Sequence, residues 1–357
     1  MRREVHKFGG ASVKDADGVR NVARILQGIC DEGKCPAVVV SAMGKTTNAL
    51  EATWNALPHA DEVERVLEDV WRFHLDIVSD LGLQGSVLDE DGAVFRATAR
   101  GLMGHDQSDA GYDAIVGFGE RFSTRIVHAY LSASGMKAQW HSGWSLFRTD
   151  GQHRSAQVDL KETGSRLREA AAQSETPGSI MLTQGFVGGT AQGIPTTLGR
   201  EGSDFSGALL AEALKANRFV VWKDVPGVMT GDPRRWPPAR PIRRLDYHTA
   251  ERMSEAGAGI LHPATMAPLR REDIPLEVRS FVDPKAVGTT IHGNEPPPSL
   301  PNLWAFSRDE KGDMVRCLTE DPEEMRREWS AAFPEIPIDA PTLDPRISRC
   351  YRFRTAG

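Results

Sequence analysis

Four segments of the 357-residue chain combine glycines with charged or hydroxyl side chains. The first, HKFGGAS, places Lys7 before the adjacent Gly9 and Gly10. Glycines permit a tight turn and let backbone N–H groups approach a ligand closely, and the lysine brings a cation to the same place. A single Lys-x-Gly-Gly is a weak signal, because a solvated lysine beside a turn gives the same pattern. The prediction of an anion-binding site therefore depends on the other three segments.

The second and third segments each lead into a predicted helix, whose free N-terminal N–H groups attract anions. SAMGKTTNAL carries hydroxyl groups at Ser41 and Thr47. TTLGREGSDFSGALLAEAL places Arg200 among glycines and puts Ser203 and Asp204 directly before the helix. An arginine fork can hold a carboxylate by two parallel hydrogen bonds. Asp204 taken alone also has a simpler interpretation, as a helix cap with no further role.

The fourth segment, KDVPGVMTGDPRR, adds the charges of Lys223, Asp224 and Arg234 around glycine and proline turns. Glycine turns, helix N-termini and lysines together suit phosphoryl transfer from a nucleotide, which needs positioning and charge neutralisation more than covalent help. The chain has no GxxxxGK[ST] motif and no protein-kinase motif set. It also lacks GxGxxG, which argues against a dinucleotide-dependent oxidoreductase.

Three apolar runs supply the strands that must position these segments: AVVVSAMG (37–44), SIMLTQGF (179–186) and FVVWKDV (219–225). Continuous apolar runs rich in β-branched residues are typical of strands buried on both faces of a parallel sheet. Helical patterns lie between them, including one that Asp15 can cap and a mostly helical stretch over 51–110. Alternating strands and helices predict a three-layer α/β fold with the site at the carboxyl ends of the strands.

Composition narrows the class of partner. A net charge of -6 without a basic block does not fit a nucleic-acid binder. The N-terminus has no apolar signal-peptide core, and no run approaches the roughly 18 apolar residues of a membrane span. The four cysteines lack metal-ligand spacing. We therefore expect a cytoplasmic protein that acts on a small molecule, with no protein-held metal site.

The ordered motifs resemble those of the aspartokinases in the amino acid kinase family. They are KFGGAS, VVVSAMGKTTNAL, GFGERFST, TTLGREGSDFSGALLAEAL, VWKDVPGVMTGDPR and GILHPATMAPL. The resemblance covers residues 1 to about 292. It implies an αβα sandwich on an eight-stranded, mainly parallel sheet. It also implies transfer of the γ-phosphate of ATP, with Mg²⁺, to the side-chain carboxylate of L-aspartate, in the first step towards lysine and threonine. A homodimer is usual in the family.

The resemblance also implies domains and residue roles. Residues 1–293 would form the catalytic domain, with a lobe of about 1–198 for the amino acid and one of about 199–293 for ATP. Lys7 would neutralise the transferred phosphoryl group, Gly9 and Gly10 would bind ATP phosphates, and Asp204 would orient the lysine and the reacting groups. The substrate pocket would be formed by Ser41, Thr47, Glu120, Arg200 and Ser203. The residues on the ATP side would be Lys223, Asp224, Met229 and Arg234. Glu120 would bind the substrate ammonium and Arg200 its α-carboxylate.

Two departures from the family pattern concern the nucleotide. Gly259 stands where the family usually has a phosphate-binding lysine, and Lys223 stands where a threonine-like residue is usual. We therefore predict that Lys223 supplies the missing charge. Met229 replaces a frequent aromatic residue, so softer thioether packing would replace stacking. His262 is interpreted as a structural hydrogen-bonding residue near a turn.

The C-terminal region departs most. NEPPPSLP (294–301) is interpreted as a linker, because clustered prolines cannot continue a helix or a central strand. Residues 302–357 contain one predicted strand, NLWAFSR, and one predicted helix, DPEEMRREWSAAF. The family usually carries two regulatory ACT modules, for which this tail is too short, so we expect it to pack on the main domain or on another subunit. An active aspartate kinase is the first hypothesis, and the short tail leads us to expect that it is unregulated or differently regulated. A kinase for an aspartate-like amino acid and a weakly active regulatory paralogue remain as alternatives.

Overall fold

The computed structural model describes residues 3–58, 60–105, 107–199, 201–258, 261–293, 301–309, 312–336, 341–347 and 349–354. The chain divides into two compact units, Met1–Asp224 and Val225–Gly357. This division falls later than the predicted boundary between an amino-acid lobe and an ATP lobe, and that functional division stays a prediction. Arg200, Gly259 and residues 294–300 of the predicted linker lie outside the described residues.

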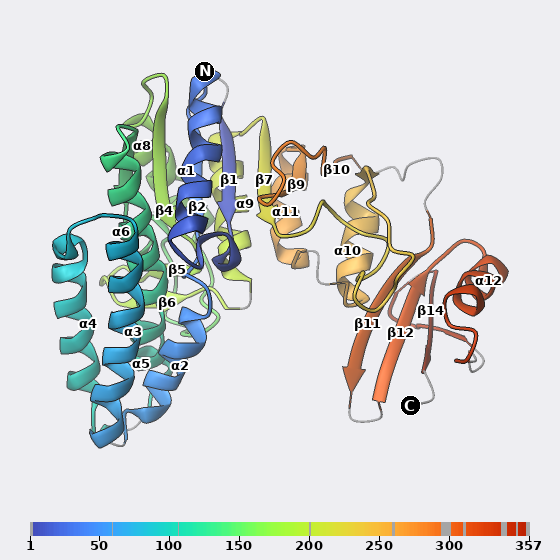
Figure 1. The fold of residues 1–357 in the computed structure, drawn as a ribbon, viewed down its shortest axis with the longest axis horizontal. Helices are drawn as coiled ribbons and strands as arrows, with labels where there is room; N and C mark the ends of the chain where they lie inside the picture. The colour runs from blue at the N-terminus through green and yellow to red at the C-terminus, as the bar shows by residue number, and fades with distance from the viewer. Residues whose placement is uncertain are drawn as a thin grey trace. The chain divides into compact units, whose positions relative to one another are not determined.

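The first unit alternates strands and helices, as the sequence predicts (Figure 1). Its strands are β1 (Glu4–Phe8), β2 (Ala37–Val40), β3 (Lys137–His141), β4 (Ser179–Gln184), β5 (Val187–Gly189), β6 (Pro195–Thr197) and β7 (Arg218–Lys223). Its helices are α1 (Ala16–Asp31), α2 (Thr46–Ala56), α3 (Ala60–Asp80), α4 (Asp89–Leu102), α5 (Asp109–Val116), α6 (Phe118–Ala133), α7 (Gly143–Leu146), α8 (Leu160–Ala172) and α9 (Gly202–Leu214), with 3-10 turns η1 (Gly10–Val13) and η2 (Gly85–Leu88).

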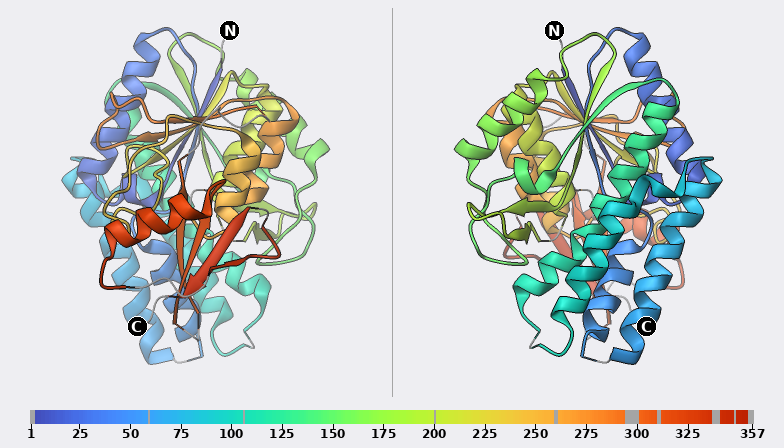
Figure 2. Two further views of the ribbon diagram at one scale, coloured as in Figure 1. Left: turned by 90° about the vertical axis from the view of Figure 1, so that its right-hand side faces the viewer. Right: turned by 90° about the vertical axis from the view of Figure 1, so that its left-hand side faces the viewer.

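An eight-stranded, mainly parallel sheet has the strand order β3-β4-β2-β1-β7-β9-β10-β8, in agreement with the predicted fold class. In the first unit the neighbouring pairs from β3 to β7 are all parallel. Every residue of β2 and β4 is buried, which explains their continuous apolar runs. Figure 2 shows α1 and α6 on one side of these strands and α8 and α9 on the other.

The observed start of helix α1 agrees with the prediction from the sequence, whereas that of α9 does not. Asp15 caps α1 and accepts a hydrogen bond from the Gly18 N–H, as predicted. The helix expected after Asp204 begins earlier, at Gly202, so Asp204 lies in its first turn. The N-cap is Glu201, in the left-handed conformation with φ 54°. The simple interpretation of Asp204 as a helix cap is therefore wrong.

The second unit contains the remaining elements. They are β8 (Arg244–Leu245), α10 (Tyr247–Glu255), α11 (Pro263–Arg271), β9 (Leu276–Ser280), β10 (Thr289–Ile291), β11 (Leu303–Asp309), β12 (Gly312–Leu318), α12 (Pro322–Ala332), β13 (Thr342–Leu343) and β14 (Cys350–Arg354). Within it, β10 pairs parallel with β8 and antiparallel with β9. His262 caps α11 by accepting a hydrogen bond from the Ala264 N–H, which confirms its structural interpretation.

The C-terminal tail has more structure than the one strand and one helix predicted. The predicted strand and helix correspond to β11 and α12, but the tail also contains β12, β13 and β14 in a four-stranded antiparallel sheet ordered β11-β12-β14-β13. Arg316 interrupts the apolar pattern of β12, and it forms an ion pair with the buried Asp344 at 3.1 Å. The partner of Arg316 is distant in the sequence, so the local pattern around this arginine does not predict a strand.

The tail packs on a residue of the predicted catalytic domain, as expected. Its core contains Trp304, Trp329 and Phe353, and Trp236 from the segment before β8 joins this cluster. The rings of Trp236 and Trp304 stack with centroids 4.4 Å apart. Because a tail of this size buries little apolar surface by itself, the extra tryptophan enlarges its core.

Within the described parts of the chain, no helix has the length and apolar character to span a membrane.

Two glycines provide a matched test of the packing of α9 on β7. A Cβ added at Gly207 would lie 2.5 Å from Cζ of the buried Phe219 ring, whereas one at Gly28 on α1 would meet nothing within 4 Å. We expect Gly207→Ala to lower the free energy of unfolding by about 1–3 kcal/mol. Gly28→Ala should leave it unchanged or raise it by up to about 1 kcal/mol. Denaturant unfolding measures both, and equal effects would contradict this account of the packing.

Candidate active site

The carboxyl ends of three parallel strands meet beside Lys7. Phe8 of β1 lies opposite Val40 of β2 and Trp222 of β7. Ser41 and Lys223 follow those two partners directly, so the sheet register brings them to the same edge as Lys7. This is the place where the sequence predicts the site, because ligands of open α/β sheets bind at the carboxyl ends of strands.

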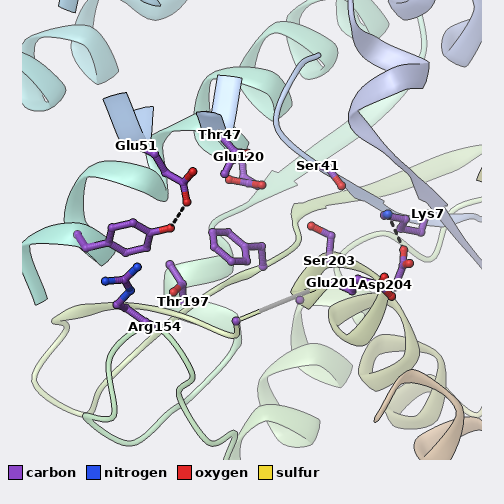
Figure 3. A pocket seen from close by; sticks show the side chains of 14 residues that line it. Lys7, Ser41, Thr47, Glu51, Glu120, Arg154, Thr197, Glu201, Ser203 and Asp204 are labelled. Atoms are coloured by element: carbon purple, nitrogen blue, oxygen red, sulfur yellow. Dashed lines mark hydrogen bonds and ion pairs between the residues drawn. The ribbon is translucent and has the colours of Figure 1, made fainter. Parts of the chain in front are cut away.

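A cavity of about 580 Å³ opens at this edge of the first unit. Lys7, Ser41, Thr47, Glu51, Tyr112, Glu120, Arg154, Phe186, Thr197, Gly199, Glu201, Gly202, Ser203 and Asp204 line it. In the view of Figure 3, Lys7 and Asp204 lie at one end and Glu51 and Arg154 at the other, with Glu120 between them. Six predicted site residues therefore come together: Lys7, Ser41, Thr47, Glu120, Ser203 and Asp204.

An ion pair joins Lys7 to Asp204, with 2.5 Å between Nζ and Oδ1. Both side chains are largely buried, at 12% and 7% exposed. The lysine comes from β1 and the aspartate from the first turn of α9, so the pair connects the sheet to this helix. A Cβ on Gly9 would lie 3.6 Å from the lysine Nζ. This is an ordinary van der Waals separation, so the contact by itself does not require glycine at that position.

Gly10 allows the loop after β1 to contact the loop after β2. A Cβ on Gly10 would lie 2.6 Å from the Ala42 carbonyl oxygen and 3.0 Å from that of Gly44. The Gly44 N–H donates to the Gly10 carbonyl at 3.0 Å, and Gly44 has a left-handed φ of 53°. The glycines of the first two sequence segments thus hold two loops together. Gly10 does not line the cavity.

Glu120 is a buried carboxyl group at the start of α6 and is 3% exposed. Its Oε1 accepts a hydrogen bond from the Ala42 N–H at 3.2 Å. Its Oε2 has no hydrogen-bond partner among the described residues. Burial raises the pKa of Glu120 to about 8, although the Ala42 N–H and the charge of Lys7 act in the opposite direction. An incoming cation would supply the missing partner and favour the ionised form.

The first turn of α9 approaches the end of β4 closely at Ser203. A Cβ on Gly185 would lie only 2.6 Å from the Ser203 Cβ, so glycine is needed there. Gly199 and Glu201, on either side of the predicted carboxylate-binding Arg200, both line the cavity and both have positive φ. Arg200 itself lies outside the described residues, and its role stays a prediction.

One end of the cavity was not predicted from the sequence motifs; it is formed by Glu51, Tyr112, Arg154 and Thr197. Tyr112 OH donates to Glu51 Oε1 at 2.6 Å, and the guanidinium of Arg154 lies 4.1 Å from the centre of the Tyr112 ring. Of these four residues, only Glu51 could have been predicted from the local sequence, because it follows the predicted site residue Thr47 by one helical turn. The others come from distant segments. Phe186 and Glu201 are further lining residues that were not predicted.

The residues predicted for the ATP side have different surroundings. Lys223 is half-buried; burial lowers its pKa, an effect that the charge of Asp204 opposes and that of Lys7 reinforces. Asp224 is exposed and does not line the cavity. In the second unit, Met229 bridges to Pro241, and the exposed Arg234 pairs with Asp232 at 2.9 Å. The nucleotide roles of these residues stay predictions.

No cluster of three or more His, Cys, Asp or Glu side chains among the described residues is arranged to hold a metal ion. Mg²⁺ in kinase sites is usually held by substrate phosphates, water and one or two carboxylates. The Asp204 carboxylate in the cavity fits that donor set.

Comparisons with known proteins agree on one family. Residues 2–280 match the sequence model of the amino acid kinase family. The chain is 34% identical to lysine-sensitive aspartokinase 3 of Escherichia coli K12 over 86% of its own length and 68% of that protein. It is 32% identical to chloroplastic aspartokinase 2 of Arabidopsis thaliana, over 80% of this chain and 54% of the relative. It spans only 32% of the length of a chloroplastic bifunctional aspartokinase/homoserine dehydrogenase from the same plant.

Solved structures give the same result. The crystal structure of E. coli aspartokinase III with aspartate and ADP has a TM-score of 0.77 and 29% identity, over 99% of this chain and 78% of that one. The complex of that enzyme with lysine and aspartate matches equally well, with a TM-score of 0.77 and 30% identity over 99% of this chain and 79% of that one. On its sequence, its sheet and the composition of its cavity, the chain belongs to the amino acid kinase family, among the aspartokinases.

Proposed function

We propose that this protein is an aspartate kinase, which transfers the γ-phosphate of ATP to the side-chain carboxylate of L-aspartate to give 4-phospho-L-aspartate. The observation that carries the proposal is the content of one cavity. It holds a lysine paired with an aspartate and also a buried glutamate, one oxygen of which has no hydrogen-bond partner among the described residues. The relatives are named aspartokinases, so an aspartate-like acceptor and a weakly active regulatory paralogue are not favoured.

Substrate recognition follows from the charges of an amino acid. The ammonium of aspartate would bind Glu120, which lines the cavity and has one oxygen without a hydrogen-bond partner among the described residues. The bound ammonium would favour the ionised form of this carboxyl group. Arg200 would hold the α-carboxylate. Ser41, Thr47 and Ser203 would donate or accept hydrogen bonds around the bound acid. A zwitterion held at both charges has a fixed orientation, which directs its side-chain carboxylate toward Lys7.

Phosphoryl transfer then requires neutralisation more than proton chemistry. The acceptor is a carboxylate, which is already ionised at neutral pH, so no strong general base is needed. Lys7 would neutralise the charge on the transferred group, and Asp204 orients its ammonium through the 2.5 Å ion pair. Backbone N–H groups at Gly9 and Gly10 would bind phosphate oxygens. Mg²⁺, when bound with ATP, would neutralise phosphate charge, with Asp204 as the carboxylate that would hold it.

The oligomeric state and the metabolic role of the protein are inferred from the family. A homodimer and a place in lysine and threonine biosynthesis are parts of this proposal that rest on the resemblance alone.

The direct test is an ATP-consumption assay in which the acyl phosphate is trapped as a hydroxamate. It should be run over L-aspartate, L-glutamate and aspartate analogues. We expect ATP consumption and hydroxamate formation that depend on L-aspartate. If only another acid is turned over, that acid and not aspartate is the acceptor. If no acid is turned over, the kinase assignment is refuted.

The pKa of Glu120 predicts the pH dependence of aspartate use. Because burial raises this pKa to about 8, the free site holds a neutral carboxyl group at lower pH. The ionised form must be generated to bind the ammonium, so kcat/KM for aspartate should rise about tenfold per pH unit up to a plateau near pH 8. Glu120→Gln should lower kcat/KM strongly and remove this dependence.

Protein stability provides a second measurement of the same group. Between its unfolded value of 4.5 and about 8, Glu120 binds a proton in the folded state only, so its contribution to stability falls as pH rises. The loss should amount to at most about 1.4 kcal/mol per pH unit. Glu120→Gln should therefore gain in unfolding free energy relative to the wild type across this range. Parallel pH profiles for the two proteins would contradict the raised pKa.

Lys223 is expected to neutralise phosphate charge in place of the lysine absent at Gly259. It is half-buried and lies within electrostatic range of both Lys7 and Asp204. Lys223→Ala should raise the KM for ATP and lower kcat, with a combined loss of about tenfold or more. Lys161→Ala, at an exposed lysine of α8, is the matched control for a loss of charge. Steady-state kinetics within twofold of wild type for Lys223→Ala would refute this role.

A further inference from the structure

The end of the cavity away from Lys7 contains a second cation. Among the described residues that line the cavity, Lys7 and Arg154 are the two with positive charge. Figure 3 shows them at opposite ends, with Glu120 between. Sequence analysis assigned no role to Arg154, which lies in the loop between α7 and α8.

The backbone at Arg154 has an unfavourable conformation that its neighbours enforce. Its φ of 65° lies in the left-handed region, which costs about 1–2 kcal/mol for a residue with a side chain. The carboxylate of Asp113, which is fully buried, accepts hydrogen bonds from the Arg154 N–H at 3.0 and 3.1 Å. The same carboxylate is bonded to His153 Nδ1 at 2.9 Å and to Thr197 Oγ1 at 2.6 Å. This clamp holds the turn in one place beside α5 and β6.

The Arg154 side chain lies over an aromatic ring that is itself fixed. Its guanidinium is 4.1 Å from the centre of the Tyr112 ring, and Tyr112 precedes the clamping Asp113 on α5. Burial, together with the bond to Glu51, raises the pKa of Tyr112 to about 12, so its hydroxyl group remains a donor to Glu51 at neutral pH. A stacked guanidinium presents its N–H groups at its edge, where an anion can bind those that do not face Asp109.

A purely structural role explains these contacts less well. Arg154 also forms an ion pair with Asp109 at 3.3 Å, but the two side chains are 52% and 65% exposed. Exposed ion pairs of this kind contribute little to stability and require no left-handed backbone. The pair therefore gives no reason for the clamp or for the position of the side chain on the cavity wall.

The order of charges along the cavity matches that of the proposed acceptor, on whose identity this inference rests. Aspartate has a carboxylate at each end and an ammonium between them. The cavity presents Lys7, Glu120 and Arg154 in the corresponding order. We propose that Arg154 binds the α-carboxylate of the acceptor amino acid. A carboxylate has lone pairs enough for two guanidinium groups, so this role is compatible with the one predicted for Arg200.

The test combines a change in the protein with a change in the substrate. Arg154→Gly removes the guanidinium and suits the left-handed backbone, so the variant should fold. With L-aspartate, we expect KM to rise about tenfold or more while kcat changes less than about threefold. With the α-amide of L-aspartate, which lacks the α-carboxylate, the variant and the wild type should differ by less than about twofold. If the α-amide is not phosphorylated, its inhibition constant against aspartate gives the same comparison.

Controls separate this inference from its rivals. Asp109→Asn removes the exposed ion pair and should leave KM unchanged. Arg154→Lys keeps the charge without the fork and should lie between Arg154→Gly and the wild type. Equal losses with aspartate and its α-amide, or an unchanged KM in Arg154→Gly, would overturn the role of Arg154. No aspartate turnover by the wild type would instead refute the proposed function.

Discussion

The ion pair between Lys7 and Asp204 is the interaction on which the site depends. It joins the end of the central strand β1 to the first turn of α9 in a largely buried position. Removal of one partner would leave the other charge without compensation, which is costly away from water. The pair also keeps the ammonium of the lysine at the strand edge before any ligand arrives. In the proposed mechanism, phosphate oxygens would replace or share the aspartate as the partner of this ammonium, so little reorganisation would be required during phosphoryl transfer.

Glycines make this arrangement possible because several backbones approach one another closely around the pair. Gly207 lets α9 pack on Phe219, and Gly185 leaves room for Ser203 at the start of the same helix. Gly10 allows the first two loops to meet. In each case a Cβ would lie within about 2.6 Å of another atom, a separation that real side chains do not reach. These glycines therefore serve packing, a use that was not predicted from the sequence for Gly207 and Gly185.

Among the described residues, charge compensation is incomplete elsewhere in the cavity. Glu120 is buried with one unpartnered oxygen, and its raised pKa reflects the cost of an isolated charge there. Such a group destabilises the folded protein above its ordinary titration range, and in the proposed function the substrate ammonium would supply its missing partner. Asp113 differs, because it is equally buried but receives several hydrogen bonds. The first carboxyl group is therefore suited to binding, whereas the second holds a loop.

The parallel α/β fold and the strands that end at the site could be predicted from the sequence. So could the meeting of six site residues: Lys7, Ser41, Thr47, Glu120, Ser203 and Asp204. Most of these follow from local signals, namely buried apolar runs, glycine turns and helix starts, whereas Glu120 follows from the resemblance to a known family. Only the tertiary structure placed Tyr112, Arg154 and Thr197 on the same wall, because their proximity depends on the buried Asp113. Likewise, strand β12 was not predicted, because Arg316 interrupts its apolar pattern and the partner of that arginine, Asp344, is evident only in the folded structure. Contacts between residues distant in the sequence depend on how the elements pack, so a local sequence pattern does not predict them.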